Sequence, residues 1–147
     1  MTNSTYNRSE VIRALNLFVG SGGIAEIRIM NAFGVKGRND SGYFDNFAQA
    51  AGALQQYAMS PKNPGIYFVL NPFDAELMAR ASNRFQERAN DTTQDVDIKS
   101  RRWFFIDCDP KRKTGISSTK AEWEAAKAKA EAVAQWLFDE FSFPEPI

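Results

Sequence analysis

The chain has no histidine among its 147 residues and only one cysteine, Cys108. The lack of histidine excludes a Ser-His-Asp or Cys-His catalytic group in this chain, and any metal site that needs imidazole ligands. A lone cysteine cannot form an internal disulfide, which fits a reducing, cytoplasmic environment. Metal ions that prefer oxygen ligands, such as Mg²⁺ or Mn²⁺, remain compatible with this composition.

Long apolar runs and an excess of charge of one sign are also absent. No stretch is apolar enough for a membrane span and no basic-plus-hydrophobic leader opens the chain, so we expect no membrane partner. The 18 basic and 18 acidic residues cancel, which does not favour nucleic-acid binding by bulk attraction but permits a local basic surface. The length predicts a single domain over residues 1–147.

The most informative segment is an apolar run that ends in Asp107-Cys108-Asp109-Pro110. If residues 101–109 form a strand, the two carboxylates lie on the same face, within about 7 Å of each other. Like charges repel at that distance unless a cation lies between them, and Mg²⁺ typically takes one or two carboxylates plus substrate phosphates. The pattern therefore predicts a metal-bound pair suited to phosphoryl chemistry. Solvated turns, helix caps and calcium loops share this pattern and stay open as alternatives.

The rest of the chain alternates between helix and strand patterns. Helices are expected over residues 9–18, 45–57, 74–85 and 119–141, strands over 24–30, 66–70 and 101–109, a turn at 39–42 and a loop over 86–100. Thr119 and Glu122 form a capping box for the last helix, whose apolar stripe is expected to pack into the core. This order predicts an α/β or α+β domain in which helices cover a mixed sheet. The glycine-rich turn at 20–23 precedes a strand instead of opening a helix, which argues against a P-loop.

Several segments occur together in a recognisable order. They span residues 25–28, 41–44, 65–72, 79–84, 102–110 and 115–122. With these segments the chain resembles the N-terminal part of primase-polymerases of the archaeo-eukaryotic primase superfamily, of the type encoded by phages, plasmids and other mobile elements. The resemblance covers nearly the whole chain.

The resemblance implies a catalytic core with an RRM-like sheet and an additional α/β unit, which joins nucleotides on a DNA template. Asp107 and Asp109 match the family's acid-x-acid motif and would hold two Mg²⁺ or Mn²⁺ ions in a site completed outside this chain. The implied partners are a DNA template and primer, nucleoside triphosphates, and possible helicase or replication proteins. Further candidate nucleotide or DNA contacts are Glu26, Arg28, Asn71, Arg101, Lys111, Arg112, Ser117 and Ser118. For each of these, a solvated or salt-bridged surface residue is the alternative.

One departure from the family is clear. Its second motif, a small residue followed by histidine, contacts the phosphates of the incoming nucleotide, and this chain has no histidine. We therefore expect a portion that holds the first catalytic motif and ends before the second, with a degenerate relative as the alternative. Two other functions stay open: a non-catalytic module that binds nucleic acid or a partner in a replication complex, and an unrelated Asp-x-Asp transferase such as a sugar-nucleotide enzyme.

Overall fold

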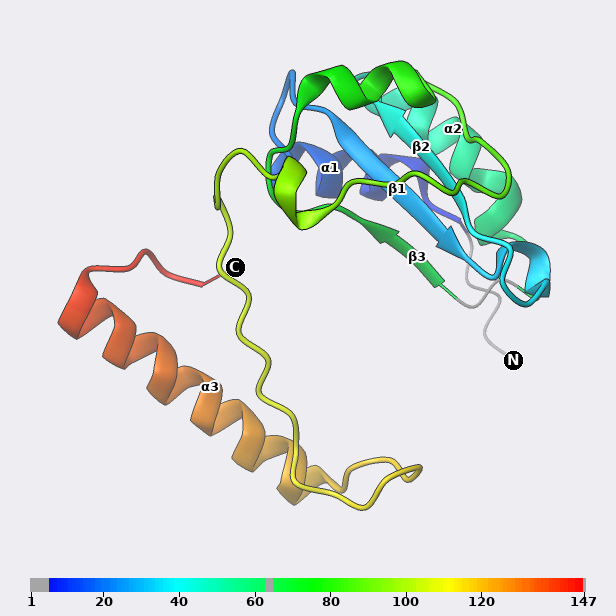
Figure 1. Ribbon diagram of the computed structural model, residues 1–147. Coiled ribbons are helices and arrows are strands. Elements are labelled where there is room, and N and C mark those ends of the chain that lie inside the picture. The colour runs from blue at the N-terminus through cyan, green and yellow to red at the C-terminus, as the bar shows by residue number, and fades with distance from the viewer. Residues whose placement is uncertain (1–5, 63–64, 147) are drawn as a thin grey trace. The chain divides into compact units, whose positions relative to one another are not determined.

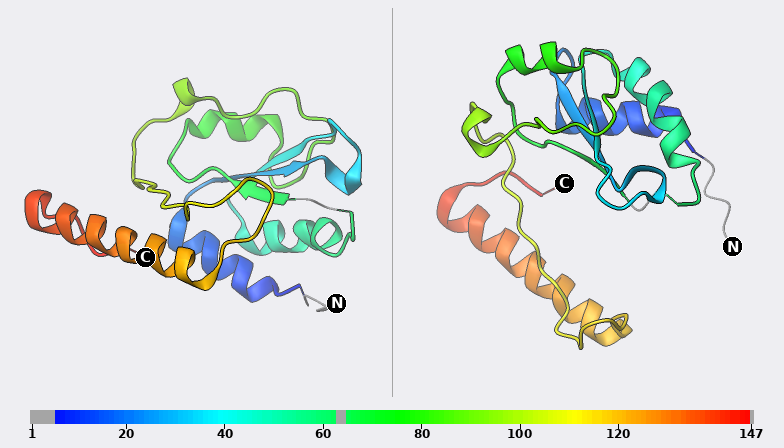
Figure 2. Two further views of the ribbon diagram at one scale, coloured as in Figure 1. Left: turned by 90° about the horizontal axis from the view of Figure 1, so that it is seen from below. Right: turned by 45° about the vertical axis from the view of Figure 1, so that its right-hand side comes forward.

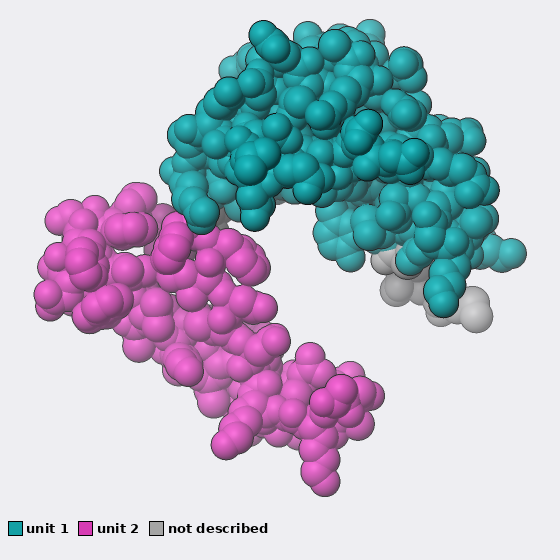
Figure 3. All heavy atoms as spheres, viewed as in Figure 1, with its two compact units in different colours: residues 1–103 teal, residues 104–147 magenta. Residues whose placement is uncertain are grey.

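The computed structural model describes residues 6–62 and 65–146 and divides the chain into two compact units (Figure 3). The first unit is Met1–Trp103 and the second is Phe104–Ile147. The first unit holds helices α1 (Arg8–Phe18) and α2 (Phe47–Ala58), strands β1 (Ala25–Met30), β2 (Asp40–Phe44) and β3 (Gly65–Phe68), and 3₁₀ helices η1 (Ala32–Gly34), η2 (Ala75–Arg80) and η3 (Asp95–Asp97). The second unit holds helix α3 (Lys120–Phe141) (Figure 1).

The three strands form an antiparallel sheet in the order β2-β1-β3, with Arg28 of β1 opposite both Ser41 and Tyr67. Helices α1 and α2 lie on one face of this sheet, and η2 with the segment that follows it lies on the other (Figures 1 and 2). The α+β class is thus confirmed. The expected mixed sheet is wrong for the described strands, because both strand pairings are antiparallel.

Alternation along β1 explains how the two faces arise. Ala25, Ile27 and Ile29 point toward α1 and α2 and are at most 1% exposed. Burying an isoleucine side chain stabilises the fold by about 1.5–3 kcal/mol, so this strand anchors the main core. The other buried members of that core are Leu15, Ala32, Phe44, Phe47, Ala50, Leu54 and Tyr57. On the opposite face, a smaller buried cluster contains Tyr43, Phe73 and Ala81.

The turn expected at residues 39–42 is wrong, because this segment enters strand β2. Glycine is needed at position 42 because the backbone of Arg84 approaches it closely. A Cβ at this position would clash with the carbonyl oxygen of Arg84. The chain around residue 84 runs along the free edge of β2, where Ser41 and Gln86 exchange backbone hydrogen bonds of 3.1 and 2.7 Å. A glycine that reads as a turn signal therefore marks a backbone contact between distant segments.

The helix expected over residues 74–85 is only partly confirmed, since the 3₁₀ helix η2 ends at Arg80. Beyond it the chain follows β2 instead of continuing the helix. The amide of Tyr43 donates to the carbonyl of Ala81 at 3.1 Å, and the amide of Asn83 donates to the carbonyl of Tyr43 at 2.7 Å. Pairing with a strand edge has replaced the local helical hydrogen bonds.

The strand expected over residues 101–109 is not formed. The segment has no regular secondary structure, and no strand of the described residues pairs with it. Apolar alternation cannot make a strand without a neighbour to receive its backbone hydrogen bonds.

Helix α3 begins as expected, with the Thr119–Glu122 capping box in place. The prediction that the apolar stripe of α3 packs into the core is wrong. None of the residues of α3 is buried, and Trp123 and Trp136 are each 54% exposed. The described part of the second unit contains no sheet or other helix against which this apolar stripe could pack.

Candidate functional site

Asp107 and Asp109 lie in the extended segment that opens the second unit, and both are exposed. Neither carboxylate forms a hydrogen bond or an ion pair with a described residue. Such a pair fits the donor set for Mg²⁺ or Mn²⁺, which combines one or two carboxylates with water or substrate phosphates. The described residues include no group of three or more acidic, cysteine or histidine side chains close enough to hold a metal ion. Within this part of the chain, no such group of three includes Asp107 and Asp109.

The basic loop that follows the pair belongs to the same unit. Lys111, Arg112 and Ser117 are exposed and Ser118 is half-buried. The guanidinium of Arg112 donates to the carbonyl of Ile116 at 2.7 Å, which closes the loop on itself. These cationic and hydroxyl groups follow the carboxylates within nine residues along the chain.

Glu26 and Arg28, both from β1, form an ion pair in the first unit whose acid is buried and whose arginine is half-buried. Glu26 is 0% exposed. Its carboxylate accepts hydrogen bonds from Nε and Nη2 of Arg28 at 3.0 and 2.8 Å, from Oγ of Ser41 at 2.7 Å and from the amide of Thr93 at 3.1 Å. Four donors satisfy this buried charge, which would otherwise be very costly. Glu26 therefore holds the loop at residue 93 against the sheet and has no surface to offer a ligand.

Asn71 has a similar fastening role. Its side-chain oxygen accepts hydrogen bonds from the amides of Arg102 and Trp103, both at 2.9 Å. The side chains of these two residues continue to the end of α1, where they donate to the carbonyls of Val19 and Phe18 at 2.9 and 2.6 Å. The approach to the aspartate segment is thus fixed up to Trp103. The neighbouring candidate Arg101 is exposed.

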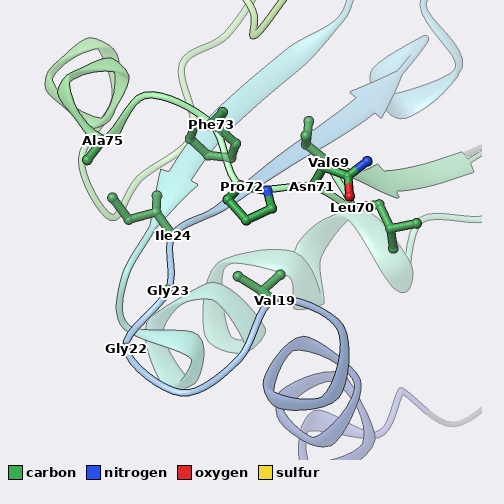
Figure 4. A pocket seen from close by; sticks show the side chains of 10 residues that line it. All are labelled: Val19, Gly22, Gly23, Ile24, Val69, Leu70, Asn71, Pro72, Phe73 and Ala75. Carbon is green, nitrogen blue, oxygen red and sulfur yellow. The ribbon is translucent and has the colours of Figure 1, made fainter. Parts of the chain in front are cut away.

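A cavity of about 250 Å³ lies beside Asn71 (Figure 4). It opens between the glycine turn before β1 and the segment after β3. Its lining residues are Val19, Gly22, Gly23, Ile24, Val69, Leu70, Asn71, Pro72, Phe73 and Ala75. The lining is largely apolar and includes no charged side chain.

Sequence reasoning missed a second buried charge network around Asp40. This carboxylate is 0% exposed and accepts from Nη2 of Arg38 at 2.9 Å, from the amide of Arg88 at 3.0 Å and from the hydroxyl of Tyr57 at 3.0 Å. Burial raises the pKa of Asp40, but the hydrogen bonds from Arg38, Arg88 and Tyr57 outweigh it and hold the pKa below its ordinary value. Burial, followed by the hydrogen bond to Asp40, raises the pKa of Tyr57. The missed signal is an acid and an arginine two residues apart, as in Glu26 and Arg28.

Six of the candidate residues belong to the second unit: Asp107, Asp109, Lys111, Arg112, Ser117 and Ser118. It places Glu26, Arg28, Asn71 and Arg101 in the first unit.

None of the helices in the described residues is both long enough and apolar enough to cross a membrane. No protein-family model matches the chain, and no curated protein or solved structure matches it. The primase-polymerase relationship therefore stays a prediction that the chain's own residues carry.

Proposed function

We propose that this chain forms the N-terminal portion of the catalytic core of a DNA primase-polymerase. The observation that carries the proposal is the Asp107-x-Asp109 motif, placed after an apolar run and among other segments in the family's order. The state of the carboxylates supports it. The two acids of the motif are exposed and unengaged by described residues, whereas the buried acids Glu26 and Asp40 are fully occupied by internal donors.

In this proposal Asp107 and Asp109 hold Mg²⁺ or Mn²⁺, with further ligands from outside the chain and from the nucleotide. The metal supplies charge neutralisation and alignment of the 3′-hydroxyl with the α-phosphate. Lys111 and Arg112 add positive charge next to the pair and attract the triphosphate. Asn71 fixes the start of the segment by accepting the amides of Arg102 and Trp103.

The cellular setting follows from the same resemblance. The substrates are a primed DNA template and nucleoside triphosphates, and the process is replication of a phage, plasmid or other mobile element in the cytoplasm, alongside a helicase or other replication proteins. The α+β architecture with an antiparallel sheet supports the proposal at the level of fold class.

Metal binding by the full chain tests the first half of the proposal. Isothermal titration calorimetry with Mn²⁺ should show binding to the wild type. The affinity of Asp107→Asn and of Asp109→Asn for Mn²⁺ should be at least tenfold weaker. Asp91→Asn is the matched control, because Asp91 is also an exposed aspartate but lies in the first unit. Equal Mn²⁺ affinity in all four proteins would contradict the metal assignment.

Nucleotide incorporation tests the second half. The protein that carries this chain should extend a primer on a DNA template in the presence of Mn²⁺, and Asp107→Asn should abolish extension. Metal binding without incorporation by any version would instead favour the non-catalytic replication module.

A further inference from the structure

Tyr67 is exceptional among the aromatic residues of the first unit. Its side chain is 58% exposed, whereas every other aromatic side chain in residues 6–62 and 65–103 is buried or half-buried. It lies on β3, opposite Arg28, on the sheet face that α1 and α2 do not cover. An exposed aromatic ring at this position adds nothing to either hydrophobic core.

The ring of Tyr67 lies over the backbone of its own strand. A Cβ at Gly65 would come within 2.7–3.0 Å of three atoms of the tyrosine side chain, Cε2, Oη and Cζ. Gly65 therefore leaves the space that the ring occupies, and the strand supports one side of the ring. Its exposed area leaves the ring accessible from solvent, as in the aromatic platforms on which unpaired bases stack.

A polar pocket adjoins this platform. It has a volume of about 230 Å³, and its lining residues are Arg28, Met30, Asn39, Asp40, Ser41, Ala89, Asn90 and Thr92. Met30 connects the two features, because it lines the pocket and is also the strand partner of Gly65. The pocket offers amide, hydroxyl and guanidinium groups. Arg28 lies one strand from Tyr67, and Ser41 lies on the next strand, β2, two strand spacings or roughly 10 Å away.

Charge decides which part of a nucleotide fits. The side chain of Arg28 is 30% exposed, but Glu26 neutralises its guanidinium through two hydrogen bonds. The carboxylate of Asp40, another residue of the lining, is fully buried and bonded to Arg38 and Tyr57 on the helix-covered face, so it adds no charge to the pocket. A phosphate finds no net positive charge here, whereas a base finds a ring for its face and polar groups for its edge.

We infer that this surface binds an unpaired base of single-stranded DNA, which stacks on Tyr67 and directs its hydrogen-bonding edge into the pocket beside Arg28. The inference rests on the proposed function, which supplies a single-stranded template. It assigns to the first unit a role in holding the template that is separate from the metal pair.

Binding of a fluorescent oligothymidine to the full chain tests the inference. Tyr67→Ala should weaken binding by about 5- to 150-fold, the value of one base–aromatic stack. Tyr67→Phe keeps the ring and should bind within about twofold of the wild type. Met59→Ala is the control, since Met59 is 65% exposed but lies at the end of α2. A strand of equal length with abasic sites should bind equally to wild type and Tyr67→Ala, and a strand with 5-iodouridine should photocrosslink to Tyr67.

Three results would overturn the inference: no binding by the wild type, equal oligothymidine binding by Tyr67→Ala, or crosslinks confined to other residues. Competition by a free mononucleotide as strong as by the oligonucleotide would also overturn it, by making the ligand a free nucleotide. Circular dichroism of each variant confirms that the sheet is intact. Mn²⁺ titration of the same samples separates the two claims. Unchanged Mn²⁺ affinity in Asp107→Asn would contradict the proposed function, whereas unchanged oligothymidine affinity in Tyr67→Ala would contradict this inference alone.

Discussion

Replacing Asp40 with asparagine tests the buried charge network on the helix-covered face of the sheet. The substitution keeps the size of the side chain but removes its charge. It also places an amide NH₂ where one carboxylate oxygen accepts hydrogen bonds from Arg38 and Tyr57. Donors then face donors in a site with no solvent exposure. We expect a marked loss of stability and no change in the order of the secondary structure.

The magnitude follows from the number and kind of bonds. Removing one partner of a buried, hydrogen-bonded ion pair costs about 3–5 kcal/mol. Asparagine retains one carbonyl oxygen, which can still accept from the amide of Arg88, so we expect about 3 kcal/mol. That is a large fraction of a typical total stability of about 5–15 kcal/mol. Glu87→Gln is the matched control, because Glu87 is paired with the same arginine at 3.2 Å but its side chain is 71% exposed.

The pH dependence gives a second readout. The folded pKa of Asp40 is lowered, so its contribution is present above the unfolded pKa of about 3.9 and is lost as pH falls through the folded pKa. The difference in unfolding free energy between wild type and Asp40→Asn should therefore be constant near neutral pH and shrink below about pH 4.

Urea unfolding at a series of pH values measures both effects. A stability difference below about 1 kcal/mol at pH 7 would contradict the burial and hydrogen bonding on which the estimate rests. A difference that stays constant down to pH 2.5 or so would contradict the lowered pKa of Asp40. An equally large loss of stability in Glu87→Gln would contradict the expectation that the buried Asp40, and not the exposed Glu87, is the dominant partner of Arg38.

Three further predictions concern single contacts. Asn71→Ala should destabilise the fold by about 1 kcal/mol and speed hydrogen exchange at the amides of residues 102–103, measured by mass spectrometry or NMR. Unchanged exchange at these amides would contradict their hydrogen bonds to Asn71. Gly42→Ala should cost about 1–3 kcal/mol in urea unfolding because a distant backbone carbonyl lies against its Cα, whereas Gly52→Ala inside α2 meets only a flexible arginine and should be neutral or stabilising by up to about 1 kcal/mol. Thr119→Ala removes the helix cap of α3 and should lower the far-UV circular dichroism signal of helix, with a cost of about 1 kcal/mol to that helix, while an unchanged spectrum would refute a helix that depends on its cap.

Elements with strong local signals could be predicted from the sequence. The apolar spacing that begins near residue 9 and the alternation of residues 24–30 each led to an element within one or two residues of its observed bounds. The capping box at Thr119 located the start of α3. Helix α1 begins at Arg8, one residue before the expected start, and the side chain of Asn7 caps it.

Elements that depend on distant partners could not be predicted in this way. Asp40 and Gly42 read locally as a turn, and their strand forms because β1 pairs with one edge of it and the segment near residue 86 bonds to the other. The buried position of Glu26 is equally non-local, since its partner Thr93 lies 67 residues away. For the candidate site, the sequence identified the residue types and their spacing at Asp107 and Asp109, but a period of two in the sequence does not supply the neighbouring strand that a sheet requires.

The long sequence separation between Glu26 and its donor Thr93 affects how the chain folds during its synthesis. At a synthesis rate of about 5–20 residues per second, roughly 3–13 s separate the appearance of Glu26 from that of Thr93. During this interval the carboxylate lacks one of its donors, and burying it would be costly. The second face of the sheet should therefore close only after residue 93 has been synthesised, and a nascent chain stalled before that point should keep β1 open to chaperones and proteases.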